Sequence, residues 1–220
     1  MQLTDLKIID YKKAWDIQKE YYQKALLCKK ESKRVENNLF FCEHPPVYTL
    51  GKSGKESNLL FSKETLGAPV YRIERGGDIT FHGLGQLVAY PIFDLEQFGL
   101  GVKDFIYKIE AVIINLCEQY GLSAGRDSNN AGVWLDVGTK NQRKIAALGF
   151  KLSRYISMHG LAFNVNTDLT WFNKMIPCGL PEFGVSSLEK ELGKKQDFEE
   201  VKYKMHQAFL KEFQVKNISI

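Results

Sequence analysis

The sequence predicts a single mixed α/β domain in which a sheet is flanked by helices. Two hydrophobic patterns alternate along its 220 residues: long amphipathic runs with helical spacing, and short apolar runs typical of strands. No internal repeat, low-complexity tract or linker interrupts them. A chain of this length fits one domain, because single domains mostly contain about 50–250 residues. We therefore treat residues 1–220 as one domain.

Helices are expected at residues 10–34, 102–120 and 198–213, with a short one at 168–173. The segment 102–120 has the clearest pattern, because its apolar residues recur with a period near 3.6 and Gly121 can end the helix. The first segment carries aromatic side chains among many lysines and glutamates, which is typical of a surface helix. The segment 198–213 places its apolar side chains along one side.

Short apolar segments bounded by proline, glycine or polar residues are typical of strands. In chain order they lie at residues 38–42, 47–50, 70–74, 79–81, 86–93, 132–136, 144–152 and 155–165. Pro45 and Pro46 separate the first two, because proline cannot donate a hydrogen bond to a strand ladder. A polar loop is expected up to about residue 66. The last two strands are expected to form a hairpin around Ser153 and Arg154.

The composition is that of an ordinary globular protein. Hydrophobic residues make up 44% and charged residues 25%. The net charge of +4 is too weak to predict nucleic-acid binding, but it is compatible with an acidic protein partner. Lysine-rich stretches at 29–34 and 190–195 are interpreted as solvated loops or helix ends. Because we see no signal peptide and no run of about 18 apolar residues, we expect a cytoplasmic protein without membrane contact.

The sequence contains four cysteines, Cys28, Cys42, Cys117 and Cys178, and they lack the short Cys/His spacings of a zinc site. No metal site is therefore predicted. The first three lie on helix faces or in an apolar strand, as inert core thiols do. Cys178 lies on an expected turn, between a proline and a glycine. Taken alone, a turn cysteine is more often structural than catalytic.

Three segments carry more glycine and reactive side chains than packing requires. The first, RGGDITFHGLGQ from Arg75 to Gln86, contains four glycines. Glycine weakens a strand unless the backbone must bend or approach a ligand closely. Its backbone N–H groups are candidate donors to an anion or oxyanion. The alternative is a tight turn with a bulge, and the segment matches neither a P-loop nor a dinucleotide-binding fingerprint.

The other two segments are KIAALG, beginning at Lys144, and PCGL, which contains Cys178. A lysine at the start of a strand usually faces solvent. His82 and His159 each precede a glycine, whereas His44 and His206 have no such context. A structural histidine is the default for each of them alone. The joint occurrence of these weak signals is what indicates a functional site.

Together, the ordered motifs RGGDITFHGLGQLVAYPI, KIAALG, HGLAFNV with Asp168-Leu169, and PCGL resemble the lipoyl(octanoyl) transferases of lipoate biosynthesis. The resemblance covers about residues 38–188. Leu84 departs from the family, which more often has proline in its HGPGQ stretch. The resemblance implies the fold of a biotin/lipoate protein ligase-like catalytic domain, a mixed sheet flanked by helices.

The resemblance implies an acyltransferase that catalyses the first step of endogenous protein lipoylation. Octanoyl would pass from octanoyl-acyl carrier protein to Cys178 as a thioester. It would then reach a specific lysine of a lipoyl domain, in a 2-oxoacid dehydrogenase subunit or in glycine cleavage H protein. Lys144 corresponds to the essential lysine of the family. No cofactor is implied, because the phosphopantetheine thioester of the carrier protein already holds the activation. A monomer is expected.

The resemblance also implies a set of substrate-binding positions. They are Arg75, Gly76, Gly77, Asp78, Ile79, Thr80, Phe81, His82, Ala147, Leu148, Gly149, His159, Gly160, Leu161 and Ala162. The small residues of KIAALG and HGLA are expected to leave a narrow apolar groove for the acyl tail. Each methylene buried there would contribute about 0.8 kcal/mol.

The chemistry of acyl transfer explains why this reaction needs both a cysteine and a lysine. A free cysteine has a pKa of about 8.5 and is mostly protonated at neutral pH. A Lys144 ammonium within a few ångströms would favour the Cys178 thiolate. Once neutral, the same amine would accept the proton of the incoming lysine, so that one residue would serve both half-reactions.

Three alternatives remain at this point. An ATP-dependent lipoate or biotin ligase would share the fold, but it would not use Cys178 and would carry an RRxSGGG-type stretch. A catalytically silent module that docks carrier proteins or lipoyl domains would need neither Cys178 nor Lys144. A cysteine thioesterase would use water in place of the amine, yet the sequence presents no His/Asp relay in a suitable position.

Overall fold

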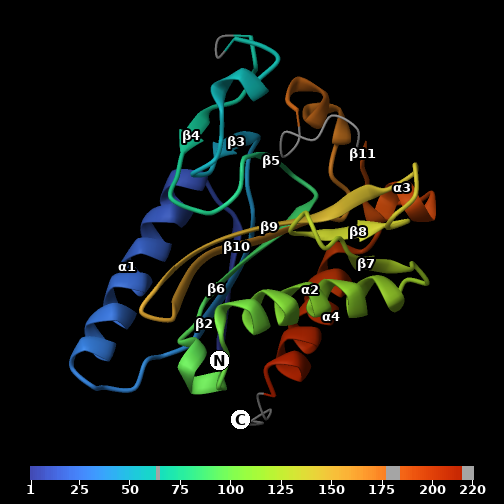
Figure 1. Cartoon of the computed structure of the whole chain (residues 1–220). Helices are drawn as coiled ribbons and strands as arrows, with labels where there is room; N and C mark the ends of the chain where they lie inside the picture. Colours follow the sequence, from blue (N-terminus) through green and yellow to red (C-terminus); the bar gives the residue numbers. More distant parts are fainter. Residues whose placement is uncertain (63–64, 177–183, 215–220) are drawn as a thin grey trace.

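The computed structural model describes residues 1–62, 65–176 and 184–214. In these ranges, a large sheet runs through the molecule and a small sheet lies at one end of it, with helices on both faces of the large sheet (Figure 1). The predicted mixed sheet flanked by helices is therefore confirmed. No helix in the described part of the chain is long and apolar enough to cross a membrane.

The large sheet contains eight strands among the described residues. Seven lie in the order β1 (Gln2–Ile8), β2 (Asn38–Glu43), β6 (Gln86–Ile92), β10 (Ile156–Asn164), β9 (Arg143–Ser153), β8 (Val133–Leu135) and β7 (Ala124–Arg126), and β11 (Gly184–Val185) pairs with β9. The β1–β2 and β11–β9 pairs are parallel, whereas the other neighbours are antiparallel. The sheet is therefore mixed.

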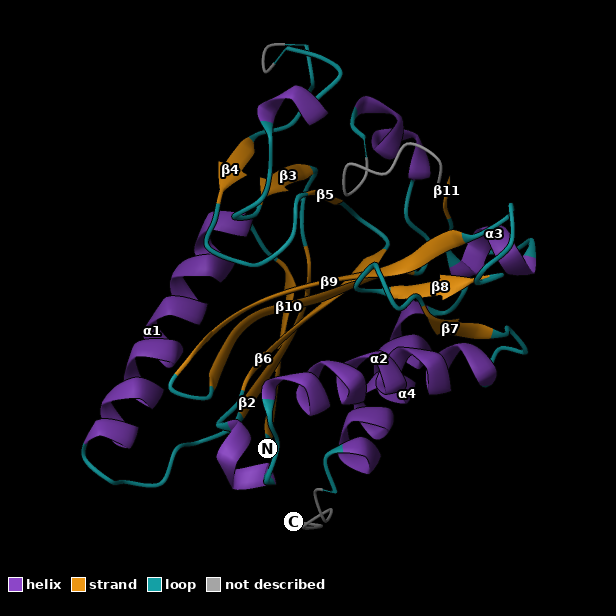
Figure 2. Cartoon of the chain, viewed as in Figure 1, coloured by secondary structure: helices purple, strands orange, loops and turns teal. Residues whose placement is uncertain are grey.

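The small sheet has the order β4 (Val70–Arg72), β3 (Val47–Leu50) and β5 (Ile79–His82) in the described ranges. It has its own core, in which Tyr48, Phe81 and Phe172 pack together. β5 continues through residues 83–85 into β6 of the large sheet (Figure 2). The glycine-rich segment singled out in the sequence therefore joins the two sheets.

The described helices are α1 (Tyr11–Lys30), α2 (Val102–Glu118), α3 (Leu188–Leu192) and α4 (Phe198–Glu212), with short 3₁₀ helices η1 (Glu56–Asn58), η2 (Leu95–Phe98) and η3 (Leu169–Lys174). α1 covers one face of the large sheet, and α2 and α4 cover the other (Figure 1). Alternate residues of β6 enter the two cores: Val88 and Tyr90 join the α1 side, Leu87 and Ala89 the opposite side. β6 is therefore buried along its whole length.

The predicted long helices are confirmed with slightly shorter ends, whereas the two outer strands of the large sheet were not predicted. β1 is only partly buried and mixes three apolar residues with four polar ones without strict alternation, so its signal is weak. β7 has three residues with no strong apolar side chain. The hairpin of β9 and β10 turns at Arg154 and Tyr155, one residue later than predicted, and Ser153 pairs with Ile156. Both turn residues have positive φ, as a two-residue hairpin turn favours.

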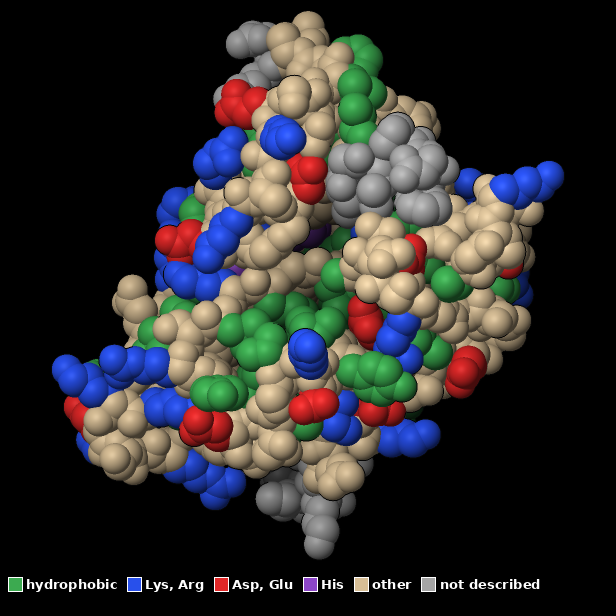
Figure 3. All heavy atoms as spheres, viewed as in Figure 1, with side chains coloured by type: hydrophobic (Ala, Val, Ile, Leu, Met, Phe, Trp, Pro, Cys, Tyr) green, Lys and Arg blue, Asp and Glu red, His purple; other side chains and the backbone are tan. Residues whose placement is uncertain are grey.

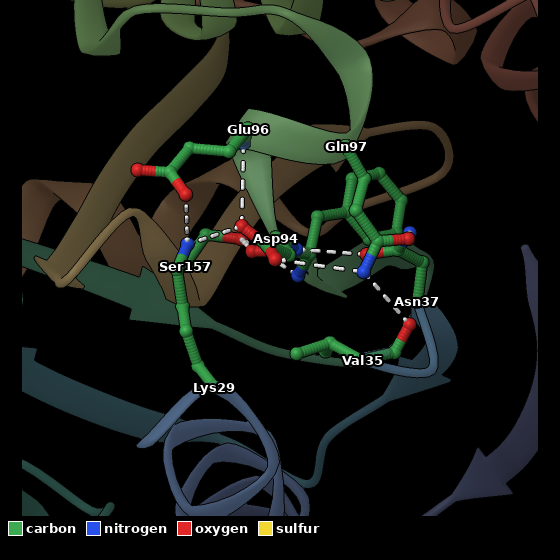
Figure 4. Close-up of polar contacts among 8 residues, drawn as sticks. Lys29, Val35, Asn37, Asp94, Glu96, Gln97 and Ser157 are labelled. Atoms are coloured by element: carbon green, nitrogen blue, oxygen red, sulfur yellow. Dashed lines mark hydrogen bonds and ion pairs between the residues drawn. The ribbon is translucent and has the colours of Figure 1, made fainter. Parts of the chain in front are cut away.

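A polar cluster ties the end of α1 to the segment that follows β6 (Figure 4). Lys29 Nζ lies 2.5 Å from Asp94 Oδ1 and 3.0 Å from Glu96 Oε2. The backbone N–H of Asp94 donates to Asn37 Oδ1 at 2.7 Å. The Lys29 side chain is only 18% exposed. Residues 30–34 are exposed at the end of α1, as predicted for the stretch 29–34, whereas Lys29 is partly buried because α1 ends beside the acidic start of η2.

Two of the cysteines expected to be inert lie in the core. Burial raises the pKa of the Cys117 thiol to about 12 and that of Cys42 well above its ordinary value. Both are therefore protonated and weak nucleophiles. Cys28 is partly exposed along α1. His44, which has no distinctive context in the sequence, is fully buried, and its Nε2 lies 2.8 Å from the Tyr90 hydroxyl.

Candidate active site

A cavity of about 460 Å³ opens where the two sheets meet. Its walls come from the start of α1, the glycine-rich segment with β5, the strands β6, β9 and β10, and the loop before β8. Figure 3 shows the hollow on this face, with apolar side chains around it and a histidine within. Concave sites with mostly apolar walls and a few polar groups are typical of small-molecule binding.

Most of the predicted site residues line this cavity. They are Lys144, Arg75, Gly77, Asp78, Ile79, Thr80, His82, Ala147, Leu148, Gly149, His159, Gly160, Leu161 and Ala162. Gly76 lies in the same segment, and its N–H donates to the carbonyl oxygen of Phe150 at 2.9 Å. Phe81 packs instead in the core of the small sheet, where it stacks on Trp171 with ring centroids 5.2 Å apart. Cys178 lies outside the described residues.

The pairing of β9 with β10 makes neighbours of two motifs that are distant in sequence. Ala147 pairs with Ala162, Leu148 with Leu161, and Gly149 with Gly160. Neighbouring atoms leave no room for a side chain at either glycine. A Cβ at Gly160 would lie 1.8 Å from the Ala89 carbonyl oxygen, and one at Gly149 would lie 2.8 Å from Arg75 Cδ. The glycines thus admit close packing, and Ala162 lies on the α1 side of the sheet with the cavity residues Val88 and Tyr90.

Arg75 is a nearly buried cation at the cavity, with 8% of its surface exposed. Its Nη2 donates to the carbonyl oxygen of Thr49 at 2.7 Å and to the Thr49 hydroxyl at 3.0 Å, and its Nη1 donates to the Gly76 carbonyl at 3.0 Å. Gly51 allows this approach, because a Cβ there would lie 2.8 Å from Nη1. β3 and the turn after it therefore hold the guanidinium in place.

His82 is neutral and has a defined tautomer. Its Nδ1 lies 2.8 Å from Gln86 Oε1, and Gln86 Nε2 donates to the Phe81 carbonyl at 3.1 Å and to Asn164 Oδ1 at 2.9 Å. A backbone carbonyl only accepts, so the amide of Gln86 presents its oxygen to the imidazole, and Nδ1 carries the hydrogen. Burial, with smaller effects of nearby charges, lowers the pKa of His82 to about 3. His82 Nε2 therefore offers a lone pair toward Thr49 Oγ1, 3.5 Å away.

Lys144 is buried, although a lysine at the start of a strand usually faces solvent. It is 8% exposed, and its Nζ donates to the Ala131 carbonyl oxygen at 3.1 Å. The same nitrogen lies 4.4 Å from the ring centroid of Trp134. Its backbone is held as well, because its carbonyl accepts from the N–H of Ser186 at 2.9 Å. The amine therefore has a defined position in the cavity wall.

Several cavity residues were not predicted from the sequence. They are Tyr11, Ser53, Val88, Tyr90, Asn129, Asn130 and Ala131. Tyr11 stacks on His82 with ring centroids 5.9 Å apart, and burial raises the pKa of its hydroxyl above the ordinary range. For Asn129, Asn130 and Ala131, in the loop before β8, the only sequence signal is the Asn-Asn pair, which is typical of a turn but does not indicate a site. These residues reach the cavity through tertiary packing.

The chain is similar in sequence to known proteins over most of its length. Residues 10–210 match the family model of the lipoyl protein ligase A/B catalytic domain. An octanoyltransferase of Bacteroides fragilis (strain YCH46) is 49% identical over 210 residues, which cover 94% of this chain and 95% of that protein. The chain belongs to the lipoyl(octanoyl) transferase family. A further octanoyltransferase, of Flavobacterium johnsoniae, is 47% identical over 93% of this chain and 93% of its own length.

Solved structures share the fold of this octanoyltransferase-family chain at low sequence identity. A bi-partite lipoate protein ligase of Thermoplasma acidophilum has a TM-score of 0.72 at 17% identity, covering 98% of this chain and 84% of that one. A biotin protein ligase of Aquifex aeolicus has a TM-score of 0.58 at 13% identity, covering 97% and 70%. These likenesses confirm the expected biotin/lipoate protein ligase-like fold.

The described residues nearest to the PCGL motif are held in place by contacts with the rest of this octanoyltransferase-family chain. The N–H of Ile176 donates to the Asn58 carbonyl at 2.8 Å. On the other side, Gly184 and Val185 form β11, which pairs with β9 so that Val185 lies opposite Lys144. Gly184 and Val185, the first described residues after the PCGL motif, therefore lie in the large sheet beside the predicted catalytic lysine.

Proposed function

We propose that the protein transfers an octanoyl group from octanoyl-acyl carrier protein, through a thioester on Cys178, to a specific lysine of lipoyl domains. The observation that carries the proposal is the buried amine of Lys144 in the wall of an apolar cavity, next to the strand that follows the PCGL motif. The octanoyltransferases that are 46–49% identical to this chain support the choice of acyl group.

In the first half-reaction, the Cys178 thiolate attacks the carbonyl carbon of the donor thioester. A new C–S bond forms on Cys178, the bond to the phosphopantetheine sulfur breaks, and that sulfur leaves as a thiolate that takes up a proton. The Lys144 ammonium stabilises the attacking thiolate by its charge. Backbone N–H groups of the glycine-rich segment are candidate donors to the developing oxyanion.

In the second half-reaction, the amine of the lipoyl-domain lysine attacks the octanoyl thioester. The C–N bond of the amide forms, the C–S bond to Cys178 breaks, and the amine proton passes to Lys144, which by then has released its own ammonium proton to solvent and is neutral. Water exclusion favours amide formation over hydrolysis, which distinguishes the transferase from a thioesterase. The acceptors are the lipoyl domains of 2-oxoacid dehydrogenase subunits and glycine cleavage H protein. We propose that the reaction takes place in the cytoplasm, on a monomer, without a cofactor or metal ion.

The octanoyl chain is proposed to lie along the paired strands β9 and β10. Ala147 and Ala162 pair across these strands in the cavity wall, and Ile79 lines the cavity from β5. The chain would contribute binding free energy in proportion to the methylenes it buries, at about 0.8 kcal/mol each. The polar groups of Arg75 and His82 are fixed by their own hydrogen bonds. They are therefore preorganised for the carbonyl end of the substrate or its phosphopantetheine arm.

The deciding experiment mixes the protein with octanoyl-carrier protein and records intact mass, with and without ATP. The expected result is an octanoyl adduct in wild type without ATP, and no adduct in Cys178→Ala. Addition of a lipoyl domain should then discharge the adduct and increase the mass of the domain. An adduct that persists in Cys178→Ala, or acylation that requires ATP and free octanoate, would contradict the proposal. The second outcome would identify a ligase.

A further inference from the structure

The loop before β8 contacts the Lys144 side chain and holds its amine in position. Lys144 Nζ donates to the Ala131 carbonyl, and the aliphatic part of the side chain passes Gly132 so closely that a Cβ there would lie 3.2 Å from Lys144 Cε. The same Cβ would lie 2.8 Å from the Ala146 carbonyl oxygen, and Gly132 has a φ of +129°. Glycine at this position thus lets the loop backbone touch the lysine. The position of the amine depends on the position of this loop.

Glu110 reaches the same loop from α2. Its Oε1 accepts the N–H of Gly132 at 3.3 Å, and its Oε2 lies 3.2 Å from Arg126 Nε on β7. Glu110 is only 7% exposed. A buried carboxylate is costly unless it is paired and hydrogen-bonded, so these two contacts are what stabilise the charge at this position. Burial also raises the pKa of Glu110, and the Gly132 and Arg126 contacts oppose that shift.

Glu110 and Lys144 bind opposite sides of one peptide group. The N–H of Gly132 and the carbonyl of Ala131 belong to the same planar unit, in which they point in opposite directions when the bond is trans. The chain of contacts therefore runs from the Glu110 carboxylate through this peptide to the Lys144 amine. A carboxylate on the N–H side polarises the peptide and strengthens the carbonyl as an acceptor.

We propose that Glu110 is a positioning residue that acts on Lys144 through the Ala131–Gly132 peptide in the acyl transfer proposed above. The inference rests on that proposed function, because only the transfer reaction gives Lys144 a catalytic task. Glu110 does not touch the substrate in this scheme. It sets the orientation and polarity of the acceptor that holds the amine. Trp134 secures the other side of the loop, since its Nε1 donates to the Asn130 carbonyl at 3.0 Å.

The test compares Glu110→Met with Glu110→Gln. Methionine matches the length of the side chain without an acceptor, whereas glutamine retains an oxygen for Gly132. We expect kcat for octanoyl transfer to fall roughly 10- to 100-fold in Glu110→Met, since small misplacements of catalytic groups have effects of this size. KM for the carrier protein should stay within about twofold, and Glu110→Gln should restore most of kcat. Glu118→Ala, an exposed position on the same helix, is the matched control.

A second readout does not depend on acyl chemistry. Lysines are reductively methylated with a ¹³C label, and the Lys144 signal is identified by its loss in Lys144→Arg. It should shift in Glu110→Met and keep its wild-type position in Glu118→Ala. If it shifts while wild type transfers no octanoyl group, the positioning role stands and the proposed function fails. An unchanged Lys144 signal together with unchanged kcat in Glu110→Met would overturn the inference.

The double variant Glu110→Met with Arg126→Met guards against misfolding. It removes both members of the ion pair between buried Glu110 and partly exposed Arg126, so that neither charge is left without its partner, a replacement that is often close to neutral for stability. The Gly132 N–H still loses its acceptor. The double variant should therefore unfold near the wild-type temperature and show the same loss of kcat and the same Lys144 shift as Glu110→Met. Wild-type values for both quantities in a folded double variant would also contradict the inference.

Discussion

Gly160 lies directly against the backbone of Ala89 on the neighbouring strand. A Cβ at Gly160 would come within 1.8 Å of the Ala89 carbonyl oxygen and within 3.1 Å of Pro91 Cδ. No side chain fits there unless β6 and β10 separate. The HGLA motif thus owes its glycine to strand packing, while its neighbours line the cavity.

Gly160→Ala is predicted to destabilise the protein strongly. The extra methyl group meets backbone rather than a flexible side chain, and overpacking of this kind costs about 3 kcal/mol or more. The free energy of unfolding in urea measures the effect. Gly184→Ala is the matched control, since a Cβ there would lie 3.5 Å from Arg143 Cβ, an ordinary contact. Equal stability of the two variants would show that the strands can separate without cost.

Lys144→Arg is predicted to separate the two half-reactions. In the proposed mechanism, arginine retains the positive charge that would favour the Cys178 thiolate, but it does not release its proton in proteins and so cannot accept one from the incoming amine. Octanoylation of Cys178 should continue, while transfer to the lipoyl domain falls by about 10² or more. Intact mass under single-turnover conditions follows both steps. Equal loss of the two steps would contradict separate roles, and an unchanged melting temperature serves as the folding control.

The buried histidines predict a loss of stability in mild acid. Burial lowers the pKa of His44 to about 4 and those of His82 and His159 to about 3. The unfolded chain takes up protons near pH 6.5, whereas the folded chain does so only below these values, so stability is fully present above pH 6.5 and falls as the pH drops. The slope is at most about 1.4 kcal/mol per pH unit for each histidine.

Urea unfolding at pH 7.5, 6.0 and 5.0 measures this dependence above the range in which most carboxylates titrate. As an independent check, the ring proton signals of these three histidines should not shift between pH 7.5 and 5.0. A stability that does not change over this range, or ring signals that titrate near pH 6.5, would show that the imidazoles are hydrated in the folded protein.

Lys29→Met is predicted to weaken the junction between α1 and η2. The side chain pairs with Asp94 and Glu96, and Asp94 is only 8% exposed. A hydrogen bond to a charged partner is worth about 1.5–3 kcal/mol, and the unpaired Asp94 adds a desolvation penalty. Lys30→Met, at the exposed neighbouring position, should change the free energy of unfolding by less than about 0.5 kcal/mol. Equal effects of the two substitutions would show that the ion pairs of Lys29 contribute no more to stability than an exposed lysine does.

The local pattern of the chain determined a large part of the fold. The long helices and the central strands carry strong periodicity, because one face of a helix or a whole buried strand must be apolar. The glycine-rich segment and the HGLA motif stand out because backbone approaches backbone or Arg75 there. The outer strands β1 and β7 carry no such signal, since an edge strand buries little surface.

The contacts among the residues of the candidate site depend on the tertiary structure and could not be predicted from the sequence. The sequence singled out Lys144, although a lysine at the start of a strand usually faces solvent. Only the contacts of its amine with the Ala131 carbonyl and the Trp134 ring, which the tertiary structure creates, make it a buried group. Glu110 carries no motif at all. Residues of this kind are brought together by strand register and helix packing, which depend on contacts across the whole chain. The sequence by itself therefore determined the family and singled out Cys178 and Lys144 as candidate reactive groups, and the packing of distant segments decided which of the described groups meet.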